Sequence, residues 1–227
     1  KLNSKANRTS AILQNSQNAL SYLQVQDSGL QTAGKIVDRM SELRVMAQDI
    51  TKNTQDIENY SKEFVELQSQ LNQVSKEKFN GISLFATSTV TAVGSLETST
   101  ASFGSLSYNT ASRTLITNDS GVSTSGSIKL NVVNFQFMLS IGTTTSGGSG
   151  IDLGNINAGT AGGSELNSSG FISDITEVNV SQFTNIIERI ADMRAENGAE
   201  QNRVLNSIDL LQTNLSNIEA AHGRIMD

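Results

Sequence analysis

The chain has 227 residues and contains no cysteine, no proline, no tryptophan and only one histidine. Without cysteine it can form no disulfide framework, no cysteine zinc site and no thiol nucleophile, and one imidazole cannot build a multi-histidine metal site. The sequence also lacks a Gly-x-Ser-x-Gly elbow and a glycine-rich phosphate-binding motif. We therefore predict that the protein is not an enzyme and that it holds no cofactor and no metal ion.

Positive charge and long apolar runs are also scarce. The formal net charge is -6, and no cluster of lysine and arginine offers the concentrated positive face that phosphate binding requires. No apolar run approaches the roughly 18 to 20 residues that span a bilayer. We expect neither a nucleic acid nor a membrane among the partners.

The charged residues are distributed unevenly along the chain. Residues 1–86 hold 19 of them and residues 171–227 hold 13, whereas residues 87–170 hold six and are rich in Ser, Thr and Gly. Ser, Thr and Gly favour turns and disfavour helix interiors. This pattern predicts one helical bundle domain built from residues 1–86 plus 171–227, interrupted by a variable β domain over residues 87–170.

Apolar residues in the two flanks recur at helical spacing. From Phe183 to Ile225 they advance by threes and fours, which predicts one helix over about 180–226, roughly 70 Å long. A similar stripe from Leu13 to Ile50 predicts a second long helix. A third stripe runs from Ile57 to Val74 after a break at 51–56, where Asn53, Thr54 and Asp56 offer oxygens that can cap it. Two helices of matching length are expected to lie side by side, as in a coiled coil.

Polar residues interrupt the C-terminal stripe. Asn197 and Gln201 suggest either a buried lock on helix register or a kink, with solvent exposure as the alternative. His222 lies on the same stripe, and we interpret it as a structural residue. Glu196 and Glu200 are interpreted as part of a solvated helix face.

The middle of the chain carries strand patterns. Alternating apolar residues from Ile128 to Leu139, with one slipped position, predict a strand with a bulge. Weaker strand candidates are 101–108, 113–117 and 170–175, and residues 142–163 are expected to form a loop. The predicted fold class is α+β: an elongated antiparallel α-helical bundle or coiled coil from both chain ends, with a small β domain inserted.

Several segments resemble one known family. Met40-Ser41-Glu42-Leu43 and the exit Lys78-Phe79-Asn80-Gly81 resemble the N-terminal half of bacterial flagellin. The stretches 198–203 and 217–225 resemble its C-terminal half, and they occur in the family's order. The middle region carries no motif of the family.

The resemblance implies an extracellular structural molecule without enzymatic activity: a self-assembling subunit of the bacterial flagellar filament that serves motility. Implied partners are other flagellin subunits, an export chaperone and the filament cap, with secretion through the flagellum's own channel. The terminal helical segments of the family are not matched, so we expect a truncated fragment. Two alternatives stay open: a hook–filament junction protein, and a flagellin-like surface module that binds a glycan or a metal.

The resemblance also suggests candidate functional residues. By motif position, Arg39, Leu43 and Glu66 are similar to residues that face a mammalian Toll-like receptor, although Leu43 also belongs to the apolar stripe. The residues expected to serve helix packing and assembly are Leu20, Leu23, Leu30, Val37, Phe64, Leu71, Ile190, Gln201, Asn202, Arg203, Ile208 and Leu215.

Overall fold

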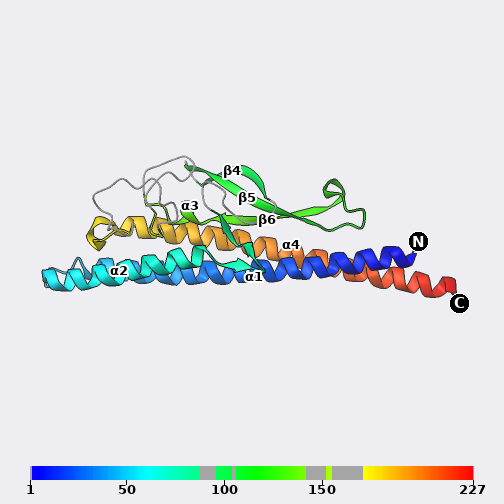
Figure 1. Cartoon of the computed structure of the whole chain (residues 1–227), viewed down its shortest axis with the longest axis horizontal. Coiled ribbons are helices and arrows are strands. Elements are labelled where there is room, and N and C mark those ends of the chain that lie inside the picture. The colour runs from blue at the N-terminus through cyan, green and yellow to red at the C-terminus, as the bar shows by residue number, and fades with distance from the viewer. Residues whose placement is uncertain (1, 87–95, 104–105, 142–151, 155–170, 227) are drawn as a thin grey trace.

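The structure, a computed structural model, describes residues 2–86, 96–103, 106–141, 152–154 and 171–226. Its dominant feature is a pair of long helices, α1 (Leu2–Met46) and α4 (Val180–Met226). They run antiparallel along most of an elongated molecule, so that both chain termini lie at the same end (Figure 1). The predicted pairing of two long helices from opposite ends of the chain is confirmed. None of the helices in the described ranges is long and apolar enough to cross a membrane.

The third helix, α2 (Thr54–Ser75), folds back along α1. Its start is fixed by a capping box: the Asn53 side chain accepts a hydrogen bond from the backbone N–H of Asp56, whose carboxylate accepts one from the backbone N–H of Asn53. After α2, a tight turn joins β1 (Lys78–Phe79) to β2 (Ile82–Ser83), with positive φ at Asn80 (54°) and Gly81 (79°). Positive φ at both central residues is what an Asn-Gly hairpin turn provides.

A four-stranded sheet lies along one side of the helix pair. Its order is β3 (Phe85–Ala86), β6 (Ser127–Asn134), β5 (Leu106–Ile116) and β4 (Glu97–Phe103). The β3–β6 pair is parallel and the other two are antiparallel. In the β5–β6 connection, half-buried Asp119 lies 3.7 Å from the Lys5 ammonium and 3.9 Å from the Arg8 guanidinium, so the hairpin tip reaches the start of α1.

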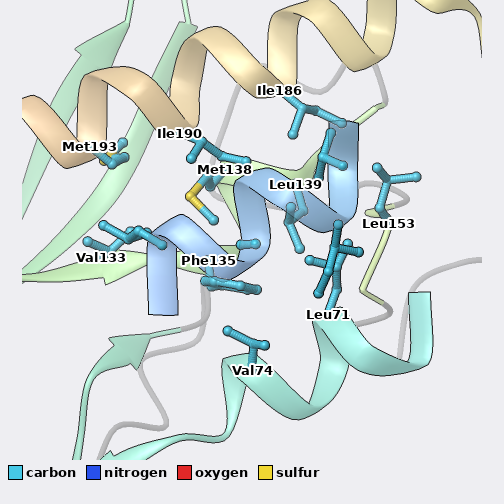
Figure 2. Close-up of a cluster of buried hydrophobic side chains, with 14 of the residues drawn as sticks. Leu71, Val74, Val133, Phe135, Met138, Leu139, Leu153, Ile186, Ile190 and Met193 are labelled. Atoms are coloured by element: carbon cyan, nitrogen blue, oxygen red, sulfur yellow. The ribbon is translucent and has the colours of Figure 1, made fainter. Parts of the chain in front are cut away.

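The predicted bulged strand over residues 128–139 is wrong in its second half. The strand β6 ends at Asn134, whose side chain accepts a hydrogen bond from the backbone N–H of Phe137, and residues Phe135–Leu139 form a short helix, α3. This helix lies between α2 and α4, and it packs Met138 and Leu139 into the apolar cluster shown in Figure 2. Every residue of α3 is buried, so no polar face marks it as helical.

The weaker strand predictions need similar correction. The candidate over 101–108 runs across the turn between β4 and β5. The candidate over 113–117 overlaps the last four residues of the longer β5 and extends one residue past its end. In place of the strand predicted over 170–175, Ile175–Glu177 form a 3-10 helix, η2, whose Asp174 carboxylate accepts from the backbone N–H of Thr176. A second 3-10 helix, η1 (Ser123–Ser125), lies in the β5–β6 connection. Most of the loop predicted over 142–163 is outside the described residues.

One large buried cluster extends through the helices, the sheet and α3. It includes Leu30 and Val37 of α1, Phe64 of α2, Val133 of β6 and Phe183 of α4. Because apolar contacts run continuously from the bundle into the sheet, the two predicted domains share a core where they meet. The proposed division into residues 1–86 plus 171–227 and residues 87–170 stays a prediction.

Candidate functional site: the junction of the helix pair and the sheet

A buried carboxamide on α1 connects both long helices to the sheet. Gln26, with an exposed fraction of 0%, donates from Nε2 to the Leu84 carbonyl at 2.8 Å and to the Asn131 carbonyl of β6 at 2.9 Å. Its Oε1 accepts a hydrogen bond from Nδ2 of Asn197 on α4 at 2.7 Å. Both ends of the carboxamide are therefore satisfied, which removes the penalty that a buried polar group otherwise carries.

Asn197 continues this network along α4. Its Nδ2 also donates to the Leu23 carbonyl at 3.1 Å, and its Oδ1 accepts from Nε2 of Gln201 at 2.5 Å. Asn197 is buried and Gln201 is half-buried. Of the predicted alternatives for Asn197, the buried lock between α1 and α4 is the one observed, since these bonds form only in one register of the two helices.

Two carboxylates of α4 face the sheet. Both oxygens of Glu200 lie 3.1 Å from the backbone nitrogen of Asn131, which donates to them, and Glu196 accepts from the Asn131 side chain at 3.1 Å. Glu200 is 3% exposed, so its predicted place on a solvated helix face is wrong. Burial raises the pKa of Glu200 to about 7; the hydrogen bond from Asn131 and the charge of Arg203 oppose the rise, and the charge of Glu196 adds to it.

A buried arginine holds α3 against α4. Arg189 donates from Nη1 to the Phe137 carbonyl at 3.0 Å and from Nη2 to the Ser140 carbonyl at 2.5 Å, and its guanidinium lies 5.4 Å from the centre of the Phe137 ring. Burial lowers its pKa from the usual arginine value. The carbonyls at the end of a short helix are orphan acceptors, and a cation there satisfies them. Sequence reasoning missed Arg189 because its partners lie far away in the chain.

A second set of carboxamides attaches α2 to the returning chain. Buried Gln68 donates to the Ile172 carbonyl at 2.9 Å and accepts from the Ile172 backbone N–H at 3.0 Å, which imitates a strand pair. Asn72 donates to the Gly154 carbonyl at 2.7 Å. Side-chain amides of α1, α2 and α4 thus repeatedly bind backbone groups of the segments between the helices.

The three candidate receptor-facing residues do not share one environment. Arg39 is exposed and donates to Glu63 of α2 at 2.7 Å and to Glu42 at 3.1 Å. Glu66 is exposed on α2, but Leu43 is fully buried at 0%. Leu43 therefore belongs to the core and is not part of a surface that this structure presents, whereas Arg39 and Glu66 are accessible.

The predicted packing and assembly residues fall into three groups by exposure. Most are buried inside the bundle, and Asn202 and Arg203 of α4 are exposed. Leu20, Gln201 and Leu215 are half-buried. The buried members are Leu23, Leu30, Val37, Phe64, Leu71, Ile190 and Ile208.

The described residues offer no arrangement typical of metal binding. No group of three or more His, Cys, Asp or Glu side chains converges in the ranges that the structure covers. His222 is half-buried near the end of α4. The junction built by Gln26, Asn197 and Glu200 can hold the two long helices and the sheet in register.

Helices α1 and α2 match the model of a known family. Residues 1–89 match the family model for the bacterial flagellin N-terminal helical region. Over these residues the chain is similar to flagellin. This match confirms the resemblance expected from the segments around Met40 and Phe79.

Two solved structures share the fold of the whole chain. The crystal structure of Bacillus cereus flagellin is 20% identical with a TM-score of 0.56, over 92% of this chain and 94% of that one. A Vibrio parahaemolyticus protein that carries the provisional name of flagellar hook-associated protein is 16% identical with a TM-score of 0.69, over 98% of this chain and 93% of that one. Such low identities show a shared fold and no more. No curated protein matches the chain.

Proposed function

We propose that this protein is a structural subunit of the bacterial flagellar filament, outside the cell, and that it assembles with copies of itself to serve motility. The observation that carries the proposal is the flagellin match over residues 1–89, which includes the 45-residue helix α1 that pairs with the 47-residue helix α4. In this proposal the helix pair forms the filament wall and the sheet faces outward. Catalysis has no part in it.

The polar surface of α4 supports contacts between copies. Asn202 and Arg203 are exposed, and they lie beside Gln201 in the segment that resembles the family's C-terminal half. The buried apolar residues hold each copy together, so lateral contacts are assigned to such exposed side chains. Arg203→Glu is expected to shorten or abolish filaments, whereas Lys35→Glu makes the same change of charge on exposed α1 and serves as the control.

The second candidate is a hook–filament junction protein. It is favoured by the higher TM-score, 0.69 against 0.56, to the hook-associated structure. Immunogold electron microscopy on cells that produce the protein separates the two. Labelling along the filament supports the filament subunit, labelling at the filament base alone supports the junction protein, and flagella without label would contradict both.

We also propose three further partners: an export chaperone, a filament cap and a mammalian Toll-like receptor. An export chaperone and a filament cap would bind the chain before and during assembly. Receptor recognition would involve exposed Arg39 and Glu66, which lie on neighbouring helices joined by the Arg39–Glu63 ion pair. A receptor reporter assay with Arg39→Ala and Glu66→Ala tests this, and unchanged signalling by both variants would remove these residues from consideration.

A further inference from the structure

The strand β4 forms one edge of the sheet. Its inner edge pairs with β5 over seven successive residues, from Glu97 opposite Ser112 to Phe103 opposite Leu106. Within the described ranges no strand pairs with its outer edge. Residues 97–100 are all exposed, and successive residues of a strand point to opposite faces, so the first half of β4 stands clear of the core on both faces, whereas Ala101 packs against the core. Figure 1 shows β4 at the side of the sheet away from the helix pair.

In the part of the chain that the structure describes, the outer edge of β4 lacks several devices that usually prevent strand addition. Natural edges are blunted by lysine, proline, bulges or inward charges. Residues 98–103 carry no charge and no proline, and the register with β5 shows no bulge. The one charged residue, Glu97, is bound by Lys129 at 2.9 Å and by Thr114 at 2.8 Å. This edge can therefore accept a further strand.

We propose that the outer edge of β4 pairs antiparallel with β4 of a second copy of this chain, so that one sheet continues across two molecules. All seven residues overlap only when Thr100 lies opposite Thr100 of the second copy. Glu97 then lies opposite an uncharged residue at position 103, whereas parallel in-register pairing would oppose the two Glu97 carboxylates. Like charges directly opposite each other destabilise a strand pair, and hydroxyl pairs such as Thr with Ser stabilise it.

The symmetry of this contact determines what it joins. An antiparallel pair of identical strands is related by a two-fold axis, with the same patch on both copies. In a polar filament all copies point the same way, so a two-fold contact cannot join neighbours of one filament. The pairing therefore links two free copies, or copies displayed on two adjacent filaments. Only the pairing between copies on adjacent filaments rests on the proposed function.

The contact is weak between single molecules. One strand pair buries less area than a standard stable interface, so we expect association only at high concentration. If many copies are displayed along two filaments, the first β4–β4 contact brings the next copies close together. Each further contact then forms at a high effective concentration, which strengthens the association of the two filaments. The test must therefore trap a short-lived pair of free molecules.

The absence of cysteine makes such a trap specific. Thr100→Cys is expected to give disulfide-linked dimers under mild oxidation, because the register places the two cysteines opposite each other. Thr98→Cys and Ser102→Cys alone should not, since each residue lies four positions, roughly 13 Å, from its own copy, beyond disulfide reach. A mixture of these two variants should give the mixed dimer. Circular dichroism checks that all three fold alike.

Two outcomes overturn the proposal: no dimer with Thr100→Cys, or equal dimer yields at all three positions. Sedimentation of cysteine-free protein gives an independent measurement. Thr100→Lys should abolish concentration-dependent association because two ammonium groups would oppose each other, whereas Ser125→Lys on the exposed hairpin tip should not. Undiminished association of Thr100→Lys would also contradict the pairing. Neither measurement requires filaments, so failure here is distinguishable from failure of the filament proposal.

Discussion

At the scale of single residues, Glu200 links stability to pH. Burial raises its pKa to about 7 from the ordinary 4.5, so the folded protein holds this proton more tightly than the unfolded chain does. The stability from this group is complete below about pH 4.5 and is lost as the pH rises through 7. Between pH 5 and pH 8, the free energy of unfolding of Glu200→Gln should therefore fall by roughly 2 to 3 kcal/mol less than that of the parent protein.

Urea unfolding at pH 5 and pH 8 measures this difference. The groups that face Glu200 are Glu196 and Arg203 of its own helix, Tyr22 of α1 and the Asn131 amide of β6. Glu188→Gln changes an exposed carboxylate on the same helix and serves as the control. An unchanged pH slope in Glu200→Gln would contradict the assignment.

Asn197 offers a second test at this scale. Asn197→Ala leaves the buried Oε1 of Gln26 without its donor, and we expect a loss of about 1 to 3 kcal/mol in the free energy of unfolding. Asn202→Ala removes a similar side chain from the exposed face of α4 and should change stability by about 0.5 kcal/mol or less. Chemical denaturation compares both with the parent, and equal effects would argue against the lock.

These residues also show how far sequence reasoning reaches into the junction. Asn197 was predictable because a polar residue within an apolar stripe stands out by its position. Glu200 and Arg189 were not, because charged residues are rarely buried and their backbone partners, Asn131, Phe137 and Ser140, are distant in the chain. Periodicity reports which face of a helix is apolar, and it does not report what lies opposite a polar residue.

At the scale of elements, two helical glycines form a matched pair. A Cβ at Gly29 of α1 would lie 2.8 Å from Cζ of Phe85, a buried ring packed on Phe135 at 4.7 Å, whereas a Cβ at Gly198 of α4 meets nothing within 4 Å. Alanine favours a helix over glycine by about 0.8 to 1 kcal/mol at both sites. Gly198→Ala should raise the melting temperature and Gly29→Ala should lower it. An increase in melting temperature with Gly29→Ala would mean that Phe85 of β3 moves aside at little cost in free energy.

The elements differ in how well the sequence predicts them. The three long helices were found because many turns repeat one apolar face, and α2 was further marked by Asn53. By contrast, α3 has only five residues, all buried, and its apolar alternation is equally compatible with a strand. Its one local signal was Asn134, which caps the helix. Short buried elements are decided by tertiary packing, which periodicity does not reveal.

At the scale of the whole molecule, packing is uneven along the rod. Before Tyr22, the fully buried residues of α1 are the small polar Thr9 and Ser16, and residues 212–224 of α4 include no buried side chain. Large buried apolar residues concentrate between Tyr22 and Leu43 and between Phe183 and Val204. Hydrogen exchange should therefore be fastest at the end that holds both termini and slowest in the middle. Uniform protection along α1 would contradict this.

The pairing of the first and last helices has a consequence for the order of folding. The Asn197–Leu23 contact joins residues 174 positions apart, so the core of α1 cannot close until nearly the whole chain is present. Contacts of such high sequence separation form late and slow folding, because a large loop must first be closed. A chain delivered end-first, from either terminus, would stay open until its last helix arrives. The arrangement that makes the finished rod continuous thus delays the closure of its core until both ends of the chain are present.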